Sequence, residues 1–341
     1  MRSSKLHPLE FHVFRQLLGL SPALFASPFG QGKWSSVKIL VACSGGLDSV
    51  ALAVCLARLS SRLGFQVVIG YVHHGPASSP EIVDARLVAF RRCRDLARDL
   101  KIPFMAAKPS GEGIELKSEG ALREHRLNSL AWIREKTQST HIAFAHHRQD
   151  LFETRLIRLL RGTGPQGLRA MQVLSGENLR PFLDVDRGEI HKYAVDQKLS
   201  WLEDPTNSDP HYLRNWLRLV WLPELELKRP GASRAFARSL ETLSQNLILP
   251  QSGDPMTSGP SFDRRRYMEL SKIEKRQAVA AFLLAQGAHE FSSRQIDEIL
   301  KRLETARHRF SFRLLKWDWE VNAEQVSVKR PSTRPPRRHA T

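Results

Sequence analysis

Short apolar runs alternate with longer amphipathic stretches between Val37 and about Tyr193. The apolar runs predict strands at residues 37–42, 66–72, 102–106 and 141–145. The stretches between and after them predict helices at residues 50–63, 82–100, 120–137 and 151–161. This strand–helix repetition predicts an α/β fold with a parallel sheet covered by helices on both faces. In such sheets ligands bind at the carboxyl ends of the strands.

The pattern changes after Pro223. Helical periodicity returns in two segments that flank a stretch rich in Pro, Ser and Gly, at residues 225–249 and 272–303. Two alternating segments near the end, 310–314 and 325–329, predict a short β-hairpin. We therefore expect a catalytic domain, a mainly helical second domain and a basic disordered tail, at residues 1–223, 224–328 and 329–341.

Composition narrows the class of protein. The chain has 341 residues and is 41% hydrophobic, which is enough for a substantial core. No apolar run approaches the roughly 20 residues that a membrane helix needs, and the first residues lack the apolar segment of a secretory signal. Its three cysteines, Cys43, Cys55 and Cys93, form no CxxC pair, so neither a disulfide framework nor a zinc site is indicated. A cytoplasmic protein is expected.

The net charge of the chain suggests nucleic acid as a binding partner. The chain carries 52 Lys and Arg against 35 Asp and Glu, a formal net charge of +17. Such an excess is typical of proteins that bind nucleic acid, because cations that neutralise phosphates release counterions. The same excess occurs when the proteins of an organism are generally basic, or when a terminal tail binds other molecules nonspecifically. Charge alone therefore leaves open whether the chain binds nucleic acid.

The segment Ser44-Gly-Gly-Leu-Asp48-Ser49 is the main candidate for a phosphate-binding site. It follows the first predicted strand and opens the first predicted helix. Its glycines allow a tight turn, and the helix N-terminus beyond them offers N–H donors and partial positive charge to an anion. Asp48 would repel a bare phosphate, which indicates a bridging Mg²⁺. An ordinary strand-to-helix turn is the alternative, but six matched positions favour the phosphate site.

These residues resemble the pyrophosphate loop of the ATP pyrophosphatase superfamily, whose members cleave ATP between the α and β phosphates. Further blocks resemble one family in it, the tRNA(Ile)-lysidine synthetases. They are Val72-His-His-Gly75, Lys117-Ser-Glu119 with Arg123-Glu-His-Arg126, Ala145-His-His-Arg-Gln-Asp150 running into Arg158-Leu-Leu-Arg-Gly-Thr-Gly-Pro-Gln-Gly-Leu168, Arg180-Pro-Phe-Leu, and Trp201-Leu-Glu-Asp-Pro-Thr-Asn207 with Tyr212-Leu-Arg214-Asn215. The resemblance is close over roughly residues 37–223 and looser beyond.

The resemblance implies a parallel five-stranded Rossmann-like sheet of the adenine nucleotide alpha hydrolase type. It also implies an enzyme that uses ATP and Mg²⁺ to adenylate the cytidine at the first anticodon position of a CAU isoleucine tRNA. Free L-lysine then displaces AMP from C2 of the base and forms lysidine. The residues leave open whether the chain forms a homodimer.

The same resemblance implies roles for particular residues. Catalysis would involve Asp48, Asp150 and Arg214, with Mg²⁺ bound through Asp48 and the pyrophosphate. The ATP-binding set would be Ser44, Gly45, Gly46, Leu47, Asp48, Ser49, His73 and His146. Lysine or tRNA would be bound by Arg123, Arg126, Glu153, Arg158, Asn215 and Arg218.

Each role has a plainer alternative. Asp150 stands at a predicted helix start, where it could serve only as a cap, and Glu153 could be a solvated helix residue. Two arginines three apart, Arg123 and Arg126, are often solvated surface. A metal site that joins the adjacent histidines to Asp150 is disfavoured, because neighbouring histidines rarely point to one centre.

The chain departs from the family pattern at four positions. Gln149 stands where a second acid is usual, so a mechanism that needs two adjacent carboxylates is in doubt. Leu151, Leu127 and Pro76 replace a usual Gln, Tyr and Leu. None of these lies in the pyrophosphate loop, which predicts a divergent but active member.

Three rival functions remain. A tRNA 2-thiolase resembling this chain would use paired cysteines or an iron–sulfur cluster, and the three cysteines fall in separate predicted elements with no evident catalytic pair. GMP and NAD synthetases lack the basic C-terminal region and the Trp-Leu-Glu-Asp-Pro block. A non-catalytic RNA-binding relative is favoured by Gln149 and disfavoured by the intact loop.

Overall fold

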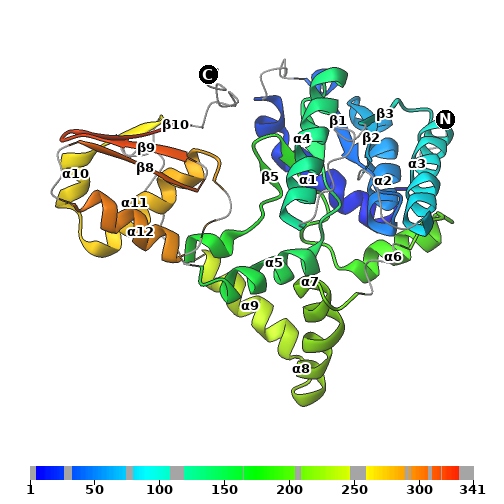
Figure 1. Ribbon diagram of the computed structural model, residues 1–341. Helices are drawn as coiled ribbons and strands as arrows, with labels where there is room; N and C mark the ends of the chain where they lie inside the picture. Colours follow the sequence, from blue (N-terminus) through cyan, green and yellow to red (C-terminus); the bar gives the residue numbers. More distant parts are fainter. Residues whose placement is uncertain are drawn as a thin grey trace. The chain divides into compact units, whose positions relative to one another are not determined.

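The computed structural model describes residues 5–26, 33–73, 80–107, 119–163, 165–203, 209–245, 259–288, 291, 293–305, 309–315 and 317–329. It divides into two compact units (Figure 1). The first unit comprises residues 1–151 and 171–215, and the second comprises residues 152–170 and 216–341. The expected boundary near Pro223 stays a prediction; it lies shortly after the point where the chain passes into the second unit. The expected tail beyond Lys329 lies outside the described residues.

A six-stranded sheet forms the centre of the first unit, in the order β3-β2-β1-β4-β6-β5. All its pairs are parallel except that of β5 with β6. The α/β class and the parallel sheet are confirmed, with six strands where five were expected. The strands are β1 (Lys38–Ala42), β2 (Gln66–Val72), β3 (Phe104–Ala107), β4 (His141–Ala143), β5 (Leu174–Ser175) and β6 (Asn178–Leu179).

Alternating side chains of β1 build a core on each face of this sheet. Ile39 and Val41 are buried in the larger cluster, whereas Leu40 is buried in a second cluster with Leu130 and Ile133. The larger core is closed by α1 (Pro8–Phe25), α2 (Leu47–Leu63), α3 (Pro80–Leu100) and α6 (Arg187–Asp196), and the second by α4 (Glu119–Thr137). Helices on both faces are thus confirmed.

Helix α1 precedes the sheet and was not anticipated from the pattern of the chain. Its Glu10 is only 3% exposed. The carboxylate accepts hydrogen bonds from the Tyr193 hydroxyl at 2.8 Å, the Arg58 guanidinium at 3.0 Å and the backbone N–H of His7 at 3.0 Å. A buried charge is tolerated when it is paired and hydrogen-bonded, so Glu10 ties α1 to α2 and α6.

The second unit begins within α5 (Arg148–Leu160) and has two apolar clusters. One joins Phe152 and Leu156 to Leu240. It is formed with the helices α8 (Leu222–Lys228) and α9 (Ala232–Gln245) and the π-helical turn Leu217–Trp221, which follows the short helix α7 (Leu213–Trp216). Arg155, 6% exposed, is stabilised beside it by Glu241 and by hydrogen bonds to the Leu168 carbonyl at 2.8 Å and Ser244 Oγ at 3.1 Å.

The other cluster lies between helices and an antiparallel sheet of order β7-β10-β9-β8. Its elements are β7 (Ser261–Asp263), α10 (Arg264–Glu269), α11 (Lys272–Ala285), α12 (Ser293–Leu303), β8 (Phe310–Leu314), β9 (Trp317–Val321) and β10 (Gln325–Lys329) (Figure 1). The two expected strands exist, but β9 pairs with both and separates them. The hairpin expectation missed β9, in which Trp319 and Val321 alternate inward.

None of the helices in the described ranges combines the length and the apolar character needed to cross a lipid bilayer.

Replacing Glu10 with Ala should destabilise the first unit, because the Tyr193 hydroxyl loses its buried partner. We expect a loss of about 2 kcal/mol in the free energy of unfolding, measured by urea titration with circular dichroism. His12→Ala is the matched control, since it removes an exposed bond to Asp184 from the same helix. Its effect should stay within about 0.5 kcal/mol. Equal effects of the two variants would contradict the role given to Glu10.

Candidate active site

The loop between β1 and α2 turns at Gly45, whose φ is 88°. A Cβ atom there would meet Cys93 Sγ, the Ala89 carbonyl and Leu202 Cδ1, each at 3.6 Å. The carbonyl of Gly45 accepts the backbone N–H of Leu202 at 3.0 Å. These are ordinary van der Waals distances, so it is the left-handed backbone that favours glycine at this position.

The hydroxyl of Ser49 holds the loop closed from within. It donates to the Gly46 carbonyl at 3.0 Å and accepts the backbone N–H of Ser44 at 3.2 Å, with Ser44 Oγ 3.3 Å away. Gly46 caps α2 without a side-chain hydrogen bond, and Leu47 begins the helix. The first N–H groups of a helix have no partner inside it, so the shape matches the predicted phosphate cradle.

Asp48 and Asp150 both approach the same nitrogen of one histidine. His147 is 3% exposed, and its Nε2 lies 3.4 Å from Asp150 Oδ2 and 4.0 Å from Asp48 Oδ2. The backbone N–H of His147 also donates to Asp150 Oδ2 at 3.0 Å. The two carboxylates that were predicted to be catalytic therefore both lie beside His147, in the segments that follow β1 and β4. Asp150 is the third residue of α5 and supports the helix start by accepting the N–H of the preceding His147, while its catalytic role stays a prediction.

His147 was not among the predicted site residues, although the adjacent histidines were noted. The choice between two neighbouring histidines depends on which side chain turns inward, and only the packed chain shows this. His146 stacks on Phe144 at 5.6 Å instead.

Basic side chains surround His146 and give this end of the sheet positive charge. Burial lowers the pKa of His146 to about 3; Asp150 opposes the shift, and Arg180, Arg126 and Arg123 add to it. The imidazole is therefore neutral at physiological pH.

Arg214 belongs to the same cluster. Loss of solvation, followed by the charges of Arg123 and Arg214, lowers the pKa of Arg126. The predicted Arg123 and Arg126 thus lie close to His146, and Arg214 lies close to Arg126. Gathered guanidinium groups favour a polyanionic ligand such as ATP or an RNA backbone.

Arg180 joins this cluster and was missed as a functional candidate. Its guanidinium lies over the Phe144 ring at 5.8 Å and donates to the Gln172 carbonyl at 3.0 Å. Burial and the charge of Arg123 lower the pKa of Arg180 to about 10. The Arg180-Pro-Phe-Leu block was the available signal, but the sequence does not show which residues the Arg180 side chain faces.

His73 ends β2 beside the loop. Its ring stacks on Phe90 at 5.5 Å and meets Tyr71 edge-on at 5.2 Å. Burial, helped by Arg86, lowers the pKa of His73. A neutral ring at this edge suits the predicted role in binding the nucleotide.

Three predicted lysine or tRNA ligands fall in the second unit. Arg218 forms a two-pronged hydrogen bond with Glu153, at 2.7 and 2.8 Å, and Glu153 is only 2% exposed. Arg158 donates to the Gly167 carbonyl at 2.7 Å. In the first unit, the Asn215 amide donates to the Asp209 carbonyl at 2.8 Å. Their roles toward ligands stay predictions.

The side chains near the loop include one carboxylate that could be a ligand for the expected Mg²⁺, that of Asp48. Among the described residues, no group of three or more His, Cys, Asp or Glu side chains could hold a metal ion. A magnesium ion bound through one or two carboxylates takes its other ligands from phosphates and water. The single partly exposed carboxylate of Asp48, at the loop, agrees with that mode of binding.

Two cysteines meet beneath the loop, contrary to the expectation from their separate places in the chain. Cys43 Sγ and Cys93 Sγ are 3.6 Å apart, because α3 packs against the end of β1. The two side chains are 4% and 0% exposed. Such burial denies the thiols the access to substrate that sulfur transfer would require.

Comparison with known proteins agrees with this geometry. The model of the PP-loop domain family matches residues 24–225. By fold, the chain is similar to the U34-tRNA thiolase NcsA from Methanococcus maripaludis, with a TM-score of 0.52 and 15% identity over 71% of this chain and 79% of that one. The sheet and its loop therefore define a PP-loop ATP-binding protein.

Two curated relatives are more similar in sequence. The tRNA(Ile)-lysidine synthase of Bdellovibrio bacteriovorus is 39% identical over 299 residues, which cover 86% of this chain and 92% of that protein. The tRNA(Ile)-lysidine synthase of Bordetella parapertussis is 32% identical, covering 82% and 84%. The chain belongs to the tRNA(Ile)-lysidine synthase family.

Ser49→Ala should weaken ATP binding about tenfold, because the loop loses a bracing hydrogen bond worth about 1.4 kcal/mol. Equilibrium dialysis with labelled ATP measures the effect. Ser60→Ala is the control, since this hydroxyl on the same helix also bonds a backbone carbonyl, that of Ala57. Unchanged ATP affinity in Ser49→Ala would show that the brace is dispensable.

The neutral state of His146 predicts a dependence of stability on pH. The folded pKa is about 3 and the unfolded value about 6.5, so His146 favours folding above pH 6.5. This contribution is lost as the pH falls below 6.5, because only the unfolded chain takes up the proton. Between pH 7 and 5, the free energy of unfolding should fall about 1–2 kcal/mol more in the wild type than in His146→Gln. Parallel urea-titration curves for the two proteins would rule this out.

Proposed function

We propose that this enzyme ligates L-lysine to C2 of the cytidine at the first anticodon position of a CAU isoleucine tRNA, using ATP and forming lysidine. The similarity to the Bdellovibrio bacteriovorus enzyme, along almost the whole length of both chains, carries the proposal. The loop at Gly45–Ser49 and the carboxylates beside His147 support it chemically.

The first chemical step would be adenylation of the base. Cytidine O2 attacks the α-phosphate of ATP, the bond to the β-phosphate breaks, and pyrophosphate leaves. The loop N–H groups and the start of α2 would hold the charge that develops on the pyrophosphate. Mg²⁺, held by Asp48 and phosphate oxygens, supplies further charge stabilisation when bound.

Lysine would be added in the second step. Its ε-amine must first lose a proton to become a nucleophile, and then attacks C2 as the bond from C2 to the adenylate oxygen breaks. A second proton leaves the new nitrogen once the C–N bond has formed. Asp150 is placed to accept or relay such a proton, because His147 holds its carboxylate beside the loop.

The neighbouring arginines suit the RNA substrate. Arg123, Arg126 and Arg180 concentrate positive charge around His146, Arg214 adds to it beside Arg126, and the whole chain carries +17. Phosphate contacts of this kind fix the position of a nucleic acid and weaken as salt is added. A cytoplasmic location belongs to this proposal, because the substrate tRNA is found there.

Incorporation of radiolabelled lysine tests the function. Purified protein is incubated with ATP, Mg²⁺, labelled lysine and a CAU isoleucine tRNA transcript, and label in acid-precipitable RNA is counted. Wild type should incorporate lysine, and Asp48→Ala should lose at least 99% of that activity, because the metal-binding carboxylate is removed.

Asp99→Ala serves as the matched control, since it removes an exposed carboxylate of α3 that pairs with Arg98 on the same helix. It should retain wild-type activity. If the wild type binds the tRNA but incorporates no lysine, the proposal fails in favour of a non-catalytic RNA-binding relative.

A further inference from the structure

Two buried thiols lie in contact beneath the pyrophosphate loop, and the proposed function uses neither of them. Cys43 Sγ is 3.6 Å from Cys93 Sγ, and Cys93 Sγ is also 3.6 Å from the Cys43 carbonyl oxygen. Cys43 follows β1 and Cys93 belongs to α3, so the contact joins segments that are 50 residues apart in the chain. Two thiols at this separation can form a disulfide after a small movement.

Both sulfur atoms lie against residues of the loop. Cys43 Sγ is 3.7 Å from the hydroxyl oxygen of Ser49, the group that holds the loop closed. Cys93 Sγ is 3.6 Å from the position that a Cβ atom of Gly45 would occupy. The backbone N–H of Cys43 donates to the Gly70 carbonyl of β2 at 2.9 Å, which anchors the chain just before the loop. A change at the sulfur atoms is therefore transmitted to the loop.

Formation of a disulfide would shorten the distance between the two sulfur atoms. An S–S bond is about 2.05 Å long, so the atoms would approach each other by about 1.5 Å. The Cys43 thiol would also lose the proton that it donates to the Ser49 oxygen. Because a phosphate cradle depends on the positions of its N–H groups, we expect the disulfide to weaken ATP binding.

The two thiols differ in reactivity. A hydrogen bond from the Cys93 thiol lowers the pKa of Cys43; burial opposes this shift, and the backbone N–H of Gly45 adds to it. The same hydrogen bond, together with burial, raises the pKa of Cys93. The thiolate is the nucleophile in thiol oxidation. Cys43 is therefore the thiol that attacks an oxidant, and Cys93 is the thiol that resolves the first product.

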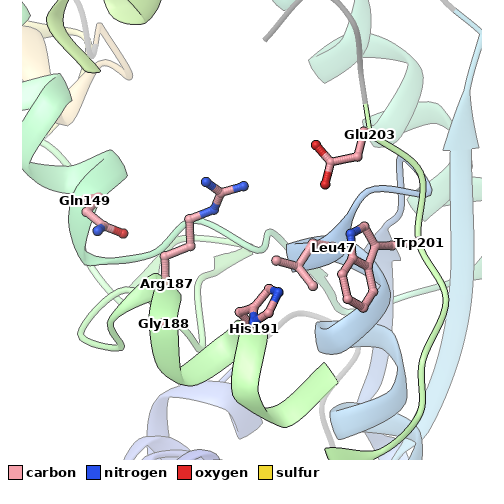
Figure 2. A pocket seen from close by; sticks show the side chains of 7 residues that line it. All are labelled: Leu47, Gln149, Arg187, Gly188, His191, Trp201 and Glu203. Carbon is pink, nitrogen blue, oxygen red and sulfur yellow. The ribbon is translucent and has the colours of Figure 1, made fainter. Parts of the chain in front are cut away.

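Burial restricts this pair to a small oxidant. Cys43 is 4% exposed and Cys93 is 0% exposed. A pocket of about 450 Å³ brings solvent to the start of α2, and its lining includes Leu47 and Trp201 (Figure 2). Hydrogen peroxide is close to water in size, so a small displacement of the loop admits it to the Cys43 sulfur, whereas an RNA base is too large.

We propose that Cys43 and Cys93 are a site of reversible oxidation, at which a peroxide forms a disulfide that weakens ATP binding. The Cys43 thiolate attacks one peroxide oxygen, the O–O bond breaks, and hydroxide leaves and takes up the thiol proton as water, so that Cys43 becomes a sulfenic acid. The Cys93 sulfur then attacks the Cys43 sulfur, the S–O bond breaks, and a second water leaves. Two thiols give up two electrons and two protons, and one peroxide becomes two molecules of water.

Oxidation of this pair is a property beyond the proposed function, since neither lysine nor tRNA takes part in it. Disulfides in a reducing compartment are transient, because thiol reductants reverse them by exchange. The pair therefore gives the protein a state with low ATP affinity while peroxide is present, and the protein leaves this state once the disulfide is reduced.

Peptide mapping and ATP binding test the proposal together. The full chain is treated with hydrogen peroxide, the excess is removed with catalase, and the remaining free thiols are alkylated. Non-reducing peptide mapping should then find the Cys43 and Cys93 peptides joined. Equilibrium dialysis with labelled ATP should give an affinity about tenfold lower than before treatment, and dithiothreitol should restore it.

The third cysteine supplies the matched control. Cys55 lies within α2 and is 0% exposed, and burial raises its pKa. Cys55→Ala should lose ATP affinity on oxidation as the wild type does. Cys43→Ala should keep its affinity within about twofold after the same treatment. If Cys43→Ala fails to fold, Cys93→Ala takes its place; it should form no cross-link, and peptide mapping should find oxygen added at Cys43.

Three results would overturn the proposal. The first is a free thiol at both Cys43 and Cys93 after methionines elsewhere in the chain have been oxidised. The second is an unchanged ATP affinity although the two peptides are joined. The third is an equal loss of affinity in the wild type and in Cys43→Ala. None of these measurements uses lysine incorporation, so the proposed function can fail while this site stands, and the reverse also holds.

Discussion

The backbone turn at Gly45 is the constraint on which the candidate site depends. With a φ of 88° and Cys93, Ala89 and Leu202 packed around its α-carbon, this residue fixes where β1 stops and α2 begins. The N-terminus of α2 can then point into the space at the ends of the strands, where an anion is stabilised. The hydrogen bond from the Leu202 N–H to the Gly45 carbonyl holds the segment around Leu202 against the same turn.

Charge is arranged around this turn in two zones. On one side, His147 holds the Asp48 and Asp150 carboxylates near each other. On the other, guanidinium groups gather around His146, whose pKa burial lowers to about 3. The negative zone suits a metal ion and an amine, and the positive zone suits phosphates. Because His146 is neutral, it adds no charge of its own to the positive zone.

The parallel sheet and the loop could be predicted because both depend on local pattern. Apolar runs gave β1 and β2 within one residue, and the glycines of the loop stand between a strand and a helix. Helix α1 and strand β9 were missed for different reasons. Helix α1 is held in place by the partners of Glu10, which are distant in the sequence. Strand β9 is recognisable mainly through its pairing with β8 and β10.

The sequence by itself determined the family, the fold class, the phosphate loop and the positive charge, because these follow from motifs, periodicity and composition. The tertiary structure decided which of two adjacent histidines sits between the carboxylates and that Cys43 meets Cys93. It also decided that Arg187 and Glu203 share a pocket with Gln149. The physical reason is that side-chain direction and contacts between distant segments are fixed only when the chain packs.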